Sequence, residues 1–420
     1  MSHSTEIIAI GTELLLGNVV NTNARDISER LSGLGIGVYY HTVVGDNPDR
    51  LRQAVEIACG RADIIITTGG LGPTYDDLTK EILAACFGKE LVYHEDIGAE
   101  IRAYFEKRLP GVKMTENNLR QAHFPEGCTI LRNNFGTAPG CAFFADGKHV
   151  IMLPGPPREC RGMFQSGAEP YLSALSDAEI ISHNIHIFGL GESAVEERLQ
   201  GLMQGLQNPT LAPYTKLGEV MLRLTAKAEN REEAERLMAP VLRQVQETLG
   251  EVIYGIDIDS LEACVLKRLL DHQKTIATAE SCTGGLLSKR LTDLPGASAA
   301  FLGGVVAYAN EVKTDLLGVE AHLIAANGAV SDPVARAMAE GVRTRLGADF
   351  GIGITGIAGP GGGTEEKPVG TVFVALATPD KTLVRRLNLG TDRTRIRTLA
   401  AHHALDMVRR YLAGLKEPPQ

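Results

Sequence analysis

A serine, a tyrosine and a lysine lie at two strand-to-helix junctions in the last third of the chain. Ser281 follows the apolar strand predicted for Lys274–Ala279 and precedes two glycines, Gly284 and Gly285, and a helix predicted from Leu286. Glycines there let a substrate approach the backbone. The free N–H groups of the first helical turn, with the positive end of the helix dipole, could hold an oxyanion.

Tyr308 and Lys313 lie at the second junction. The strand predicted for Gly303–Tyr308 runs into Asn310, a favourable N-cap, and Lys313 follows on the first helical turn. Junctions of this kind meet beyond the carboxyl ends of parallel strands, where ligands bind. Burial lowers the pKa of a lysine from ~10.4, so a Ser-Lys pair with a tyrosine relay is chemically sensible. Alternatively, Ser281 is only a helix cap and the other two side chains only pack.

A second set of candidates lies near the N-terminus. Thr67–Asp77 is a glycine-rich turn between an apolar strand and a helix, and such turns cradle phosphate with backbone N–H groups. Asp76 and Asp77 could ligate a divalent metal of unknown identity that bridges phosphates, with Glu13 as a further ligand. Alternatively, the two aspartates complement the N-terminal end of a helix. The proline-rich stretch Leu153–Glu159 is predicted to be irregular, and forms either a wall of the same pocket or a rigid turn.

Composition limits the class of protein. With 420 residues, 44% of them apolar and 22% charged, the chain is expected to hold two or three globular domains. No apolar run is long enough to span a bilayer, and the start of the chain lacks the features of a signal peptide, so we expect a cytoplasmic protein. A formal charge of −9 argues against a general nucleic-acid surface.

The number and spacing of the cysteines limit the class of protein as well. The seven cysteines form an odd set without a CxxC pair, which predicts neither a disulfide framework nor a structural zinc site. We expect them to be reduced and mostly buried.

Alternating strands and helices up to about residue 170 predict a βαβαβ unit with a parallel sheet. A smaller α/β segment, residues 175–253, has no convincing reactive cluster and is interpreted as a linker or dimerisation domain. A capped helix over Ser260–Gln273 opens a third segment. There the glycine-rich connector 356–364, between strands predicted for Asp349–Thr355 and Val369–Ala377, suggests close approach of a ligand.

Several long motifs, in this order, resemble those of the CinA family over nearly the whole chain. They are Gly11–Gly17, Asn21–Asn23, Thr68–Asp77, Leu153–Glu159, Ala279–Gly285, Tyr308–Asn310 with Lys313, Thr355–Pro360 and Lys367–Thr371. The resemblance implies an α/β protein of three domains. These are a Rossmann-like, molybdopterin-binding-type domain with a parallel sheet (1–170), a small α/β middle domain (175–253) and a C-terminal α/β CinA-type domain (255–420).

The resemblance also implies an activity for the C-terminal domain, the deamidation of nicotinamide mononucleotide to nicotinic acid mononucleotide and ammonia. Ser281 would be the nucleophile, activated by Tyr308 and Lys313, and no metal or other cofactor would be needed. The residues expected to bind this substrate are Thr283, Gly284, Gly285, Asn310, Thr355, Gly356, Gly359, Gly361, Arg393 and Arg397.

Some CinA proteins also hydrolyse ADP-ribose in a metal-dependent reaction assigned to the first domain, and Asp76 and Asp77 fall in the matching motif. The expected nucleotide-binding residues of that domain are Gly11, Thr12, Glu13, Gly69, Gly70, Gly72, Thr74, Pro154 and Gly155. We expect small-molecule nucleotides as ligands, a homodimer, and neither membrane nor direct nucleic-acid contact.

Two other classes of function remain open. One is a nucleotide- or pterin-binding module without turnover, and the other is an accessory protein in competence or DNA damage that acts through partners. The presence of Ser281, Tyr308 and Lys313 favours an enzyme.

Overall fold

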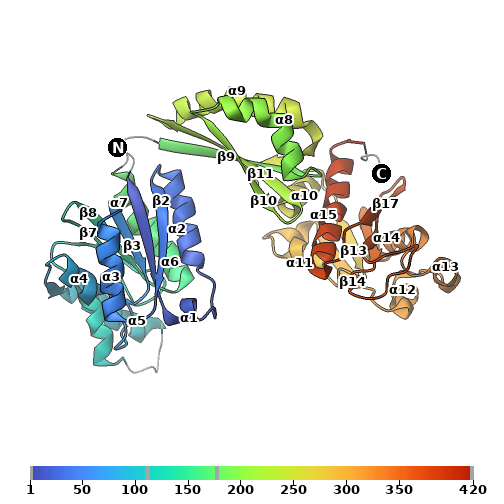
Figure 1. The fold of residues 1–420 in the computed structure, drawn as a ribbon. Coiled ribbons are helices and arrows are strands. Elements are labelled where there is room, and N and C mark those ends of the chain that lie inside the picture. The colour runs from blue at the N-terminus through green and yellow to red at the C-terminus, as the bar shows by residue number, and fades with distance from the viewer. Residues whose placement is uncertain (1–2, 109–113, 176–178, 417–420) are drawn as a thin grey trace. The chain divides into compact units, whose positions relative to one another are not determined.

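The computed structural model describes residues 3–108, 114–175 and 179–416, and it divides into two compact units (Figure 1). One unit comprises residues 1–181 and 226–236, and the other comprises residues 182–225 and 237–420. No helix in the described ranges is both long and apolar enough to cross a membrane.

The N-terminal unit is built on a six-stranded sheet with the order β2-β1-β3-β8-β7-β6. The first four strands in this order are parallel to one another, which confirms the predicted parallel βαβαβ core. β7 pairs antiparallel with β8 on one side and with β6 on the other. The strands are β1 (Ser4–Ile10), β2 (Gly37–Val44), β3 (Ile64–Thr68), β6 (Thr129–Leu131), β7 (Gly140–Ala145) and β8 (Lys148–Leu153), with a separate pair, β4 (Leu91–Tyr93) and β5 (His123–Pro125).

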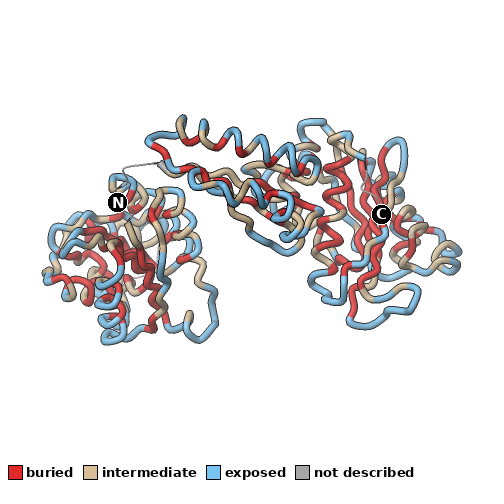
Figure 2. The backbone as a smooth tube through the Cα atoms, turned by 45° about the horizontal axis from the view of Figure 1, so that its top comes forward, coloured by how far each residue is buried: buried red, intermediate tan, exposed pale blue. Residues whose placement is uncertain are grey.

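Helices cover both faces of this sheet. Neighbouring residues of β1 show the division, because Ile7 packs in one apolar cluster with α2 and α6, and Ile8 packs in another with α3 and α4. The buried strands form the centre of the unit in Figure 2. The helices are α1 (Thr12–Leu15), α2 (Thr22–Gly33), α3 (Pro48–Cys59), α4 (Thr79–Cys86), α5 (Glu95–Arg108), α6 (Pro157–Met163) and α7 (Glu169–Ser173).

One expectation for this unit was partly wrong. Residues 153–159 were expected to be irregular, but α6 begins at Pro157. A proline at the first helical position is favourable, because its φ is already helical and its missing N–H would have no intrahelical partner there.

The middle segment forms a four-stranded sheet with the order β10-β11-β9-β12. The sequence pattern predicts strands at 180–188 and 220–227 and helices at 193–206 and 232–249, but it predicts neither β10 nor β12. β10 contains Pro213, which a sheet tolerates at an edge, and β12 is only four residues long. The elements are β9 (Glu179–Phe188), α8 (Glu192–Gly205), β10 (Thr210–Lys216), β11 (Glu219–Ala228), α9 (Arg231–Leu249) and β12 (Ile253–Ile256).

The C-terminal segment contains a five-stranded sheet with the order β14-β13-β15-β16-β17, in which β14, β13 and β15 are parallel. The strands are β13 (Ile276–Glu280), β14 (Phe301–Val306), β15 (Phe350–Gly356), β16 (Thr371–Ala377) and β17 (Thr382–Asn388). The helices are α10 (Leu261–Asp271), α11 (Leu286–Thr292), α12 (Asn310–Leu317), α13 (Ala321–Asn327), α14 (Asp332–Leu346) and α15 (Arg393–Leu412).

Helix α14 lies unusually close to β15 because that strand presents glycines to it. A Cβ atom on Gly351 would lie 2.1 Å from the Ala339 carbonyl oxygen, and one on Gly353 would lie 2.4 Å from that of Ala335. The spacing between helix and sheet therefore depends on the absence of side chains at these two positions.

We expect Gly353→Ala to destabilise the C-terminal unit by about 1–3 kcal/mol, the usual cost of overpacking, because the backbone of α14 must move away. The midpoint of urea unfolding, followed by circular dichroism, measures this. The matched control is Gly201→Ala on α8, where a Cβ meets nothing within 4 Å, and the substitution should be neutral or slightly stabilising. Equal midpoints for Gly353→Ala and the wild type would contradict the close-packing argument.

Candidate active site

The carboxyl ends of β13, β14 and β15 meet at one edge of the C-terminal sheet. The Ser281 N–H donates to the Ile354 carbonyl at 2.9 Å, and the Ala307 N–H donates to the Glu280 carbonyl at 2.8 Å. β13 lies between the other two strands, so the direction of winding reverses here, and ligands of open α/β sheets bind beyond the strand ends at such a reversal. The predicted meeting of the two junctions is confirmed.

Lys313 lies on α12, and its side chain extends to this sheet edge. Its Nζ lies 2.8 Å from the Ala307 carbonyl oxygen, 3.2 Å from that of Tyr308 and 3.4 Å from Ser281 Oγ, and the residue is only 1% exposed. Burial lowers the pKa of Lys313, against smaller opposing effects of Cys282 and Glu311. A neutral amine has two N–H bonds for the two carbonyls, which leaves its lone pair for the Ser281 hydroxyl.

Cys282 is the neighbouring alternative nucleophile. Burial, with a smaller contribution from the Glu280 carboxylate, raises the pKa of its thiol to about 12. Since the thiolate is the reactive form of cysteine, Cys282 is poorly suited to attack at neutral pH. The environment therefore favours Ser281.

Sequence reasoning missed Glu280, a fully buried carboxylate at the end of β13. Its oxygens accept the N–H groups of Leu287 at 3.0 Å and Ser288 at 2.8 Å, and the Ser288 hydroxyl at 2.6 Å. A charged residue that ends an otherwise apolar strand was the available signal.

This contact corrects the expectation that the first turn of α11 offers free N–H groups to an oxyanion. The N–H groups of Leu287 and Ser288 bind Glu280, and that of Leu286 donates to the Thr283 carbonyl at 3.2 Å. In the part of the chain that the structure describes, the N–H groups of Thr283 and Gly285 donate to no protein acceptor. Gly285, at φ 88°, adopts the left-handed conformation that turns the loop into the helix.

Two predicted residues of the second junction are arranged differently from expectation. Asn310 was expected to cap α12, but Ala309 occupies the N-cap and Asn310 is the first helical residue, exposed to solvent. The Tyr308 side chain is 64% exposed, and its hydroxyl makes no hydrogen bond to any described residue. Its main-chain carbonyl, rather than its phenol, contacts Lys313. A relay through the phenol stays a prediction.

Helix α15 braces the loops around Ser281 with two arginines. Arg397 Nη2 donates to the Thr283 carbonyl at 2.7 Å, and Arg393 Nη1 donates to the Gly359 carbonyl at 2.6 Å. Thr355 is buried and its hydroxyl donates to the Ala329 carbonyl at 2.8 Å, which is a structural contact. Of the other predicted substrate-binding residues of this region, Gly356 ends β15, and Gly284 and Gly361 lie in the loops that follow β13 and β15.

The N-terminal sheet has a cavity of ≈ 440 Å³ at the corresponding edge. Of the predicted nucleotide-binding residues, Thr12 does not line it. Instead the Thr12 hydroxyl donates to Asp46 at 2.8 Å, and Asp46 is a lining residue that sequence reasoning missed. The predicted residues that line it are Gly11, Glu13, Gly69, Gly70, Gly72, Thr74, Asp76, Asp77, Pro154 and Gly155. Glu159, from the stretch predicted as a possible wall, also lines it, and the residues missed also include Gln121 and Thr137.

The predicted metal ligands do not form a metal centre by themselves. The Thr74 hydroxyl lies 2.5 Å from a carboxylate oxygen of both Asp76 and Asp77, and Asp77 also accepts from the Thr74 N–H at 2.9 Å. Within the described ranges, no three His, Cys, Asp or Glu side chains are grouped so that they could hold an ion. Protein groups alone therefore do not fit a resident metal here.

Known proteins resemble this chain along its whole length. Family models match in three consecutive ranges, a probable molybdopterin binding domain (6–174), a damage-inducible protein CinA KH domain (182–255) and a CinA C-terminal domain (258–412). A CinA-like protein of Kosmotoga olearia is 49% identical over 98% of this chain and 99% of its own length. The chain belongs to the CinA family. A second CinA-like protein, from Dictyoglomus turgidum, is 48% identical over 98% and 99% of the two chains.

Among solved structures, a CinA protein of unknown function from Thermoplasma acidophilum is 35% identical and covers 40% of this chain and 98% of its own, with a TM-score of 0.37. CinA membership is consistent with the three-part α/β architecture and with the motifs quoted above. The names of these relatives state no reaction.

Proposed function

We propose that the C-terminal domain is an amidohydrolase that deamidates nicotinamide mononucleotide to nicotinic acid mononucleotide and ammonia. The observation that carries the proposal is the buried Lys313 amine, which two carbonyls orient toward the Ser281 hydroxyl at 3.4 Å. A contact of this length is long for a hydrogen bond, and such catalytic contacts commonly tighten when substrate binds.

In the proposed reaction, Ser281 Oγ attacks the carboxamide carbon and its proton passes to the Lys313 amine. The tetrahedral intermediate collapses when Lys313 returns that proton to the departing nitrogen, so that the C–N bond breaks and ammonia leaves an acyl-serine ester. Water then attacks the ester, Lys313 accepts the proton of the water and delivers it to Ser281, and the free acid is released.

The developing oxyanion would be held by the N–H groups of Thr283 and Gly285, which are free of protein acceptors among the described residues. Arg393 and Arg397 would supply positive charge for the phosphate of the nucleotide, since both stand at the start of α15 beside the reactive loop. None of these steps uses a metal.

A second candidate function concerns the N-terminal cavity. The glycine-rich loop on its wall and its volume of ≈ 440 Å³ favour a phosphorylated ligand, and we propose nucleotide binding with hydrolysis of ADP-ribose. Because the described carboxylates alone do not fit a metal, any divalent ion would also need oxygens of the bound phosphates.

Ser281→Ala should abolish release of ammonia from nicotinamide mononucleotide, whereas Cys282→Ala should keep most of it, because the buried thiol is protonated. A coupled ammonia assay measures both. Ammonia release that survives in Ser281→Ala would refute the assignment. A protein without turnover on this substrate would instead favour the binding-module alternative.

Lys313→Arg should reduce turnover by roughly 10²–10⁴-fold, the typical contribution of a general base, because a guanidinium cannot give up its proton at usable pH. In the wild type, kcat/KM should rise with pH through a midpoint below 10.5, since burial lowers the pKa of Lys313 and the deprotonated amine is the base. Full activity of Lys313→Arg would exclude the lysine as base.

Removal of divalent metal ions by a chelator should stop only one of the two proposed activities. We expect EDTA, or Asp76→Asn combined with Asp77→Asn, to stop hydrolysis of ADP-ribose to AMP and ribose 5-phosphate and to leave deamidation near the wild-type rate. Parallel assays of both products on one preparation measure this. If EDTA stopped ammonia release while circular dichroism still showed a folded protein, the metal-free serine mechanism would be wrong.

A further inference from the structure

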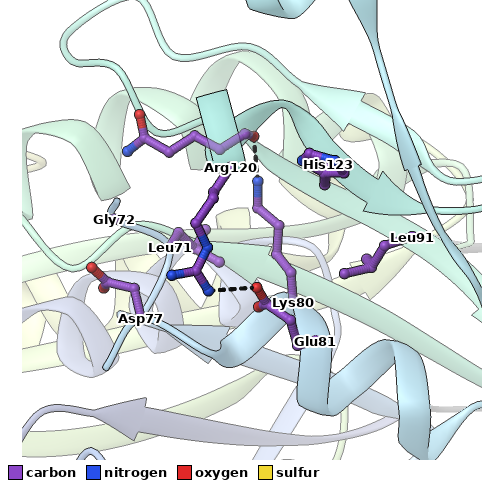
Figure 3. A pocket seen from close by; sticks show the side chains of 10 residues that line it. Leu71, Gly72, Asp77, Lys80, Glu81, Leu91, Arg120 and His123 are labelled. Carbon is purple, nitrogen blue, oxygen red and sulfur yellow. Dashed lines mark hydrogen bonds and ion pairs between the residues drawn. The ribbon is translucent and has the colours of Figure 1, made fainter. Parts of the chain in front are cut away.

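A small pocket adjoins the N-terminal cavity, and apart from residues of the glycine-rich turn its lining belongs to none of the sequence motifs (Figure 3). This pocket of ≈ 10 Å³ shares Gly70, Leu71, Gly72, Asp77 and Gln121 with the larger cavity. Its volume is about that of one water-sized sphere, so it can hold a group as small as a hydroxyl.

Gln121 presents an unused hydrogen-bond acceptor at this end. The residue is 2% exposed, and its side-chain Oε1 has no hydrogen-bond partner among the described residues. A buried carbonyl oxygen without a partner is unfavourable, so a donor from a bound molecule would be stabilised there.

A buried lysine, Lys80, holds the main chain at Gln121. Lys80 Nζ donates to the Gln121 main-chain carbonyl at 2.6 Å, and it lies 3.9 Å from the centre of the Phe124 ring. Figure 3 shows this contact together with the ion pair of Arg120 and Glu81, at 3.0 Å. The Lys80 contact holds the main chain at Gln121, and the side chain extends from this fixed point to the pocket.

The glycine-rich turn, which also lines the pocket, offers hydrogen-bond donors instead of acceptors. The N–H groups of Gly70, Leu71 and Gly72 donate to no protein acceptor in the described part of the chain, which suits an anion such as phosphate. Asp77 also borders the pocket, but its Oδ2 is already engaged by Thr74. The main-chain donors border both the larger cavity, which has room for a phosphate, and the small pocket, where Gln121 Oε1 is a buried acceptor without a protein partner.

We infer that Gln121 Oε1 accepts a hydrogen bond from a sugar hydroxyl that lies next to the phosphate of the bound ligand. Gln121 is then a specificity-determining residue for phosphorylated sugars over other phosphates. This inference rests on the proposed nucleotide binding of the N-terminal domain.

The test compares ribose 5-phosphate with methyl phosphate, which lacks sugar hydroxyls, by isothermal titration calorimetry on the full chain. Gln121→Leu should weaken binding of ribose 5-phosphate by about tenfold and leave methyl phosphate nearly unchanged, because one hydrogen bond is lost. The matched control is Gln53→Leu on the exposed face of α3, which should change neither affinity.

Gln121→Glu provides a second variant if the leucine is not tolerated. A carboxylate keeps the acceptor but repels phosphate, so both ligands should bind more weakly while the preference for ribose 5-phosphate is kept. An unchanged preference in a folded Gln121→Leu protein, or a lost preference in Gln121→Glu, would overturn the inference. If the wild type bound both ligands equally, the inference would fail while the cavity kept its proposed phosphate site. If the wild type bound neither, the proposed nucleotide binding would fail with it.

Discussion

The buried carboxylate of Glu280 connects the end of β13 to the first turn of α11, and the position of Ser281 depends on that connection. Glu280 accepts three hydrogen bonds from Leu287 and Ser288, and the Ser288 hydroxyl also lies 2.7 Å from that of Thr278. Burial of a carboxylate is unfavourable unless its oxygens are hydrogen-bonded, and here the helix N–H groups supply those bonds. The five residues between strand and helix are consequently held at both ends.

The N-terminal domain positions its cavity by a different means, the close approach of main chains. The Gly69 N–H donates to the Leu153 carbonyl at 3.0 Å, and a Cβ atom on Gly69 would lie 2.2 Å from the Ile10 carbonyl oxygen. Gly69 has a φ of 104°, which a residue with a side chain rarely adopts. Three strand ends can therefore converge, and the loops that follow them enclose one cavity. Both domains thus place their candidate sites where parallel strands end, one through a buried charge and the other through missing side chains.

Local signals explain which features the sequence could predict. The start of α3 follows from the Asn47 cap and from Pro48 at the first helical position, which are two adjacent residues. The meeting of Ser281 with Lys313 follows from a general property of parallel sheets. The role of Gln121 could not be predicted, because it lies 44 residues beyond Asp77, the last residue of the glycine-rich turn, and only the tertiary fold brings its side chain to the cavity. The orientation of the Tyr308 phenol likewise could not be predicted, because the end of a strand does not determine where the next side chain points.

Two buried lysines show how surroundings assign different chemistry to the same side chain. Burial lowers the pKa of Lys80 to about 8, so at neutral pH this lysine remains mostly protonated. Its contacts suit a cation, because an aromatic face attracts the ammonium and a carbonyl accepts one of its protons. Lys313 has two carbonyls and a serine hydroxyl around Nζ, and burial lowers its pKa as well. A neutral amine satisfies that set completely, since two carbonyls take its two N–H bonds and the hydroxyl can donate to its lone pair. The first environment therefore suits a structural cation, and the second suits a base.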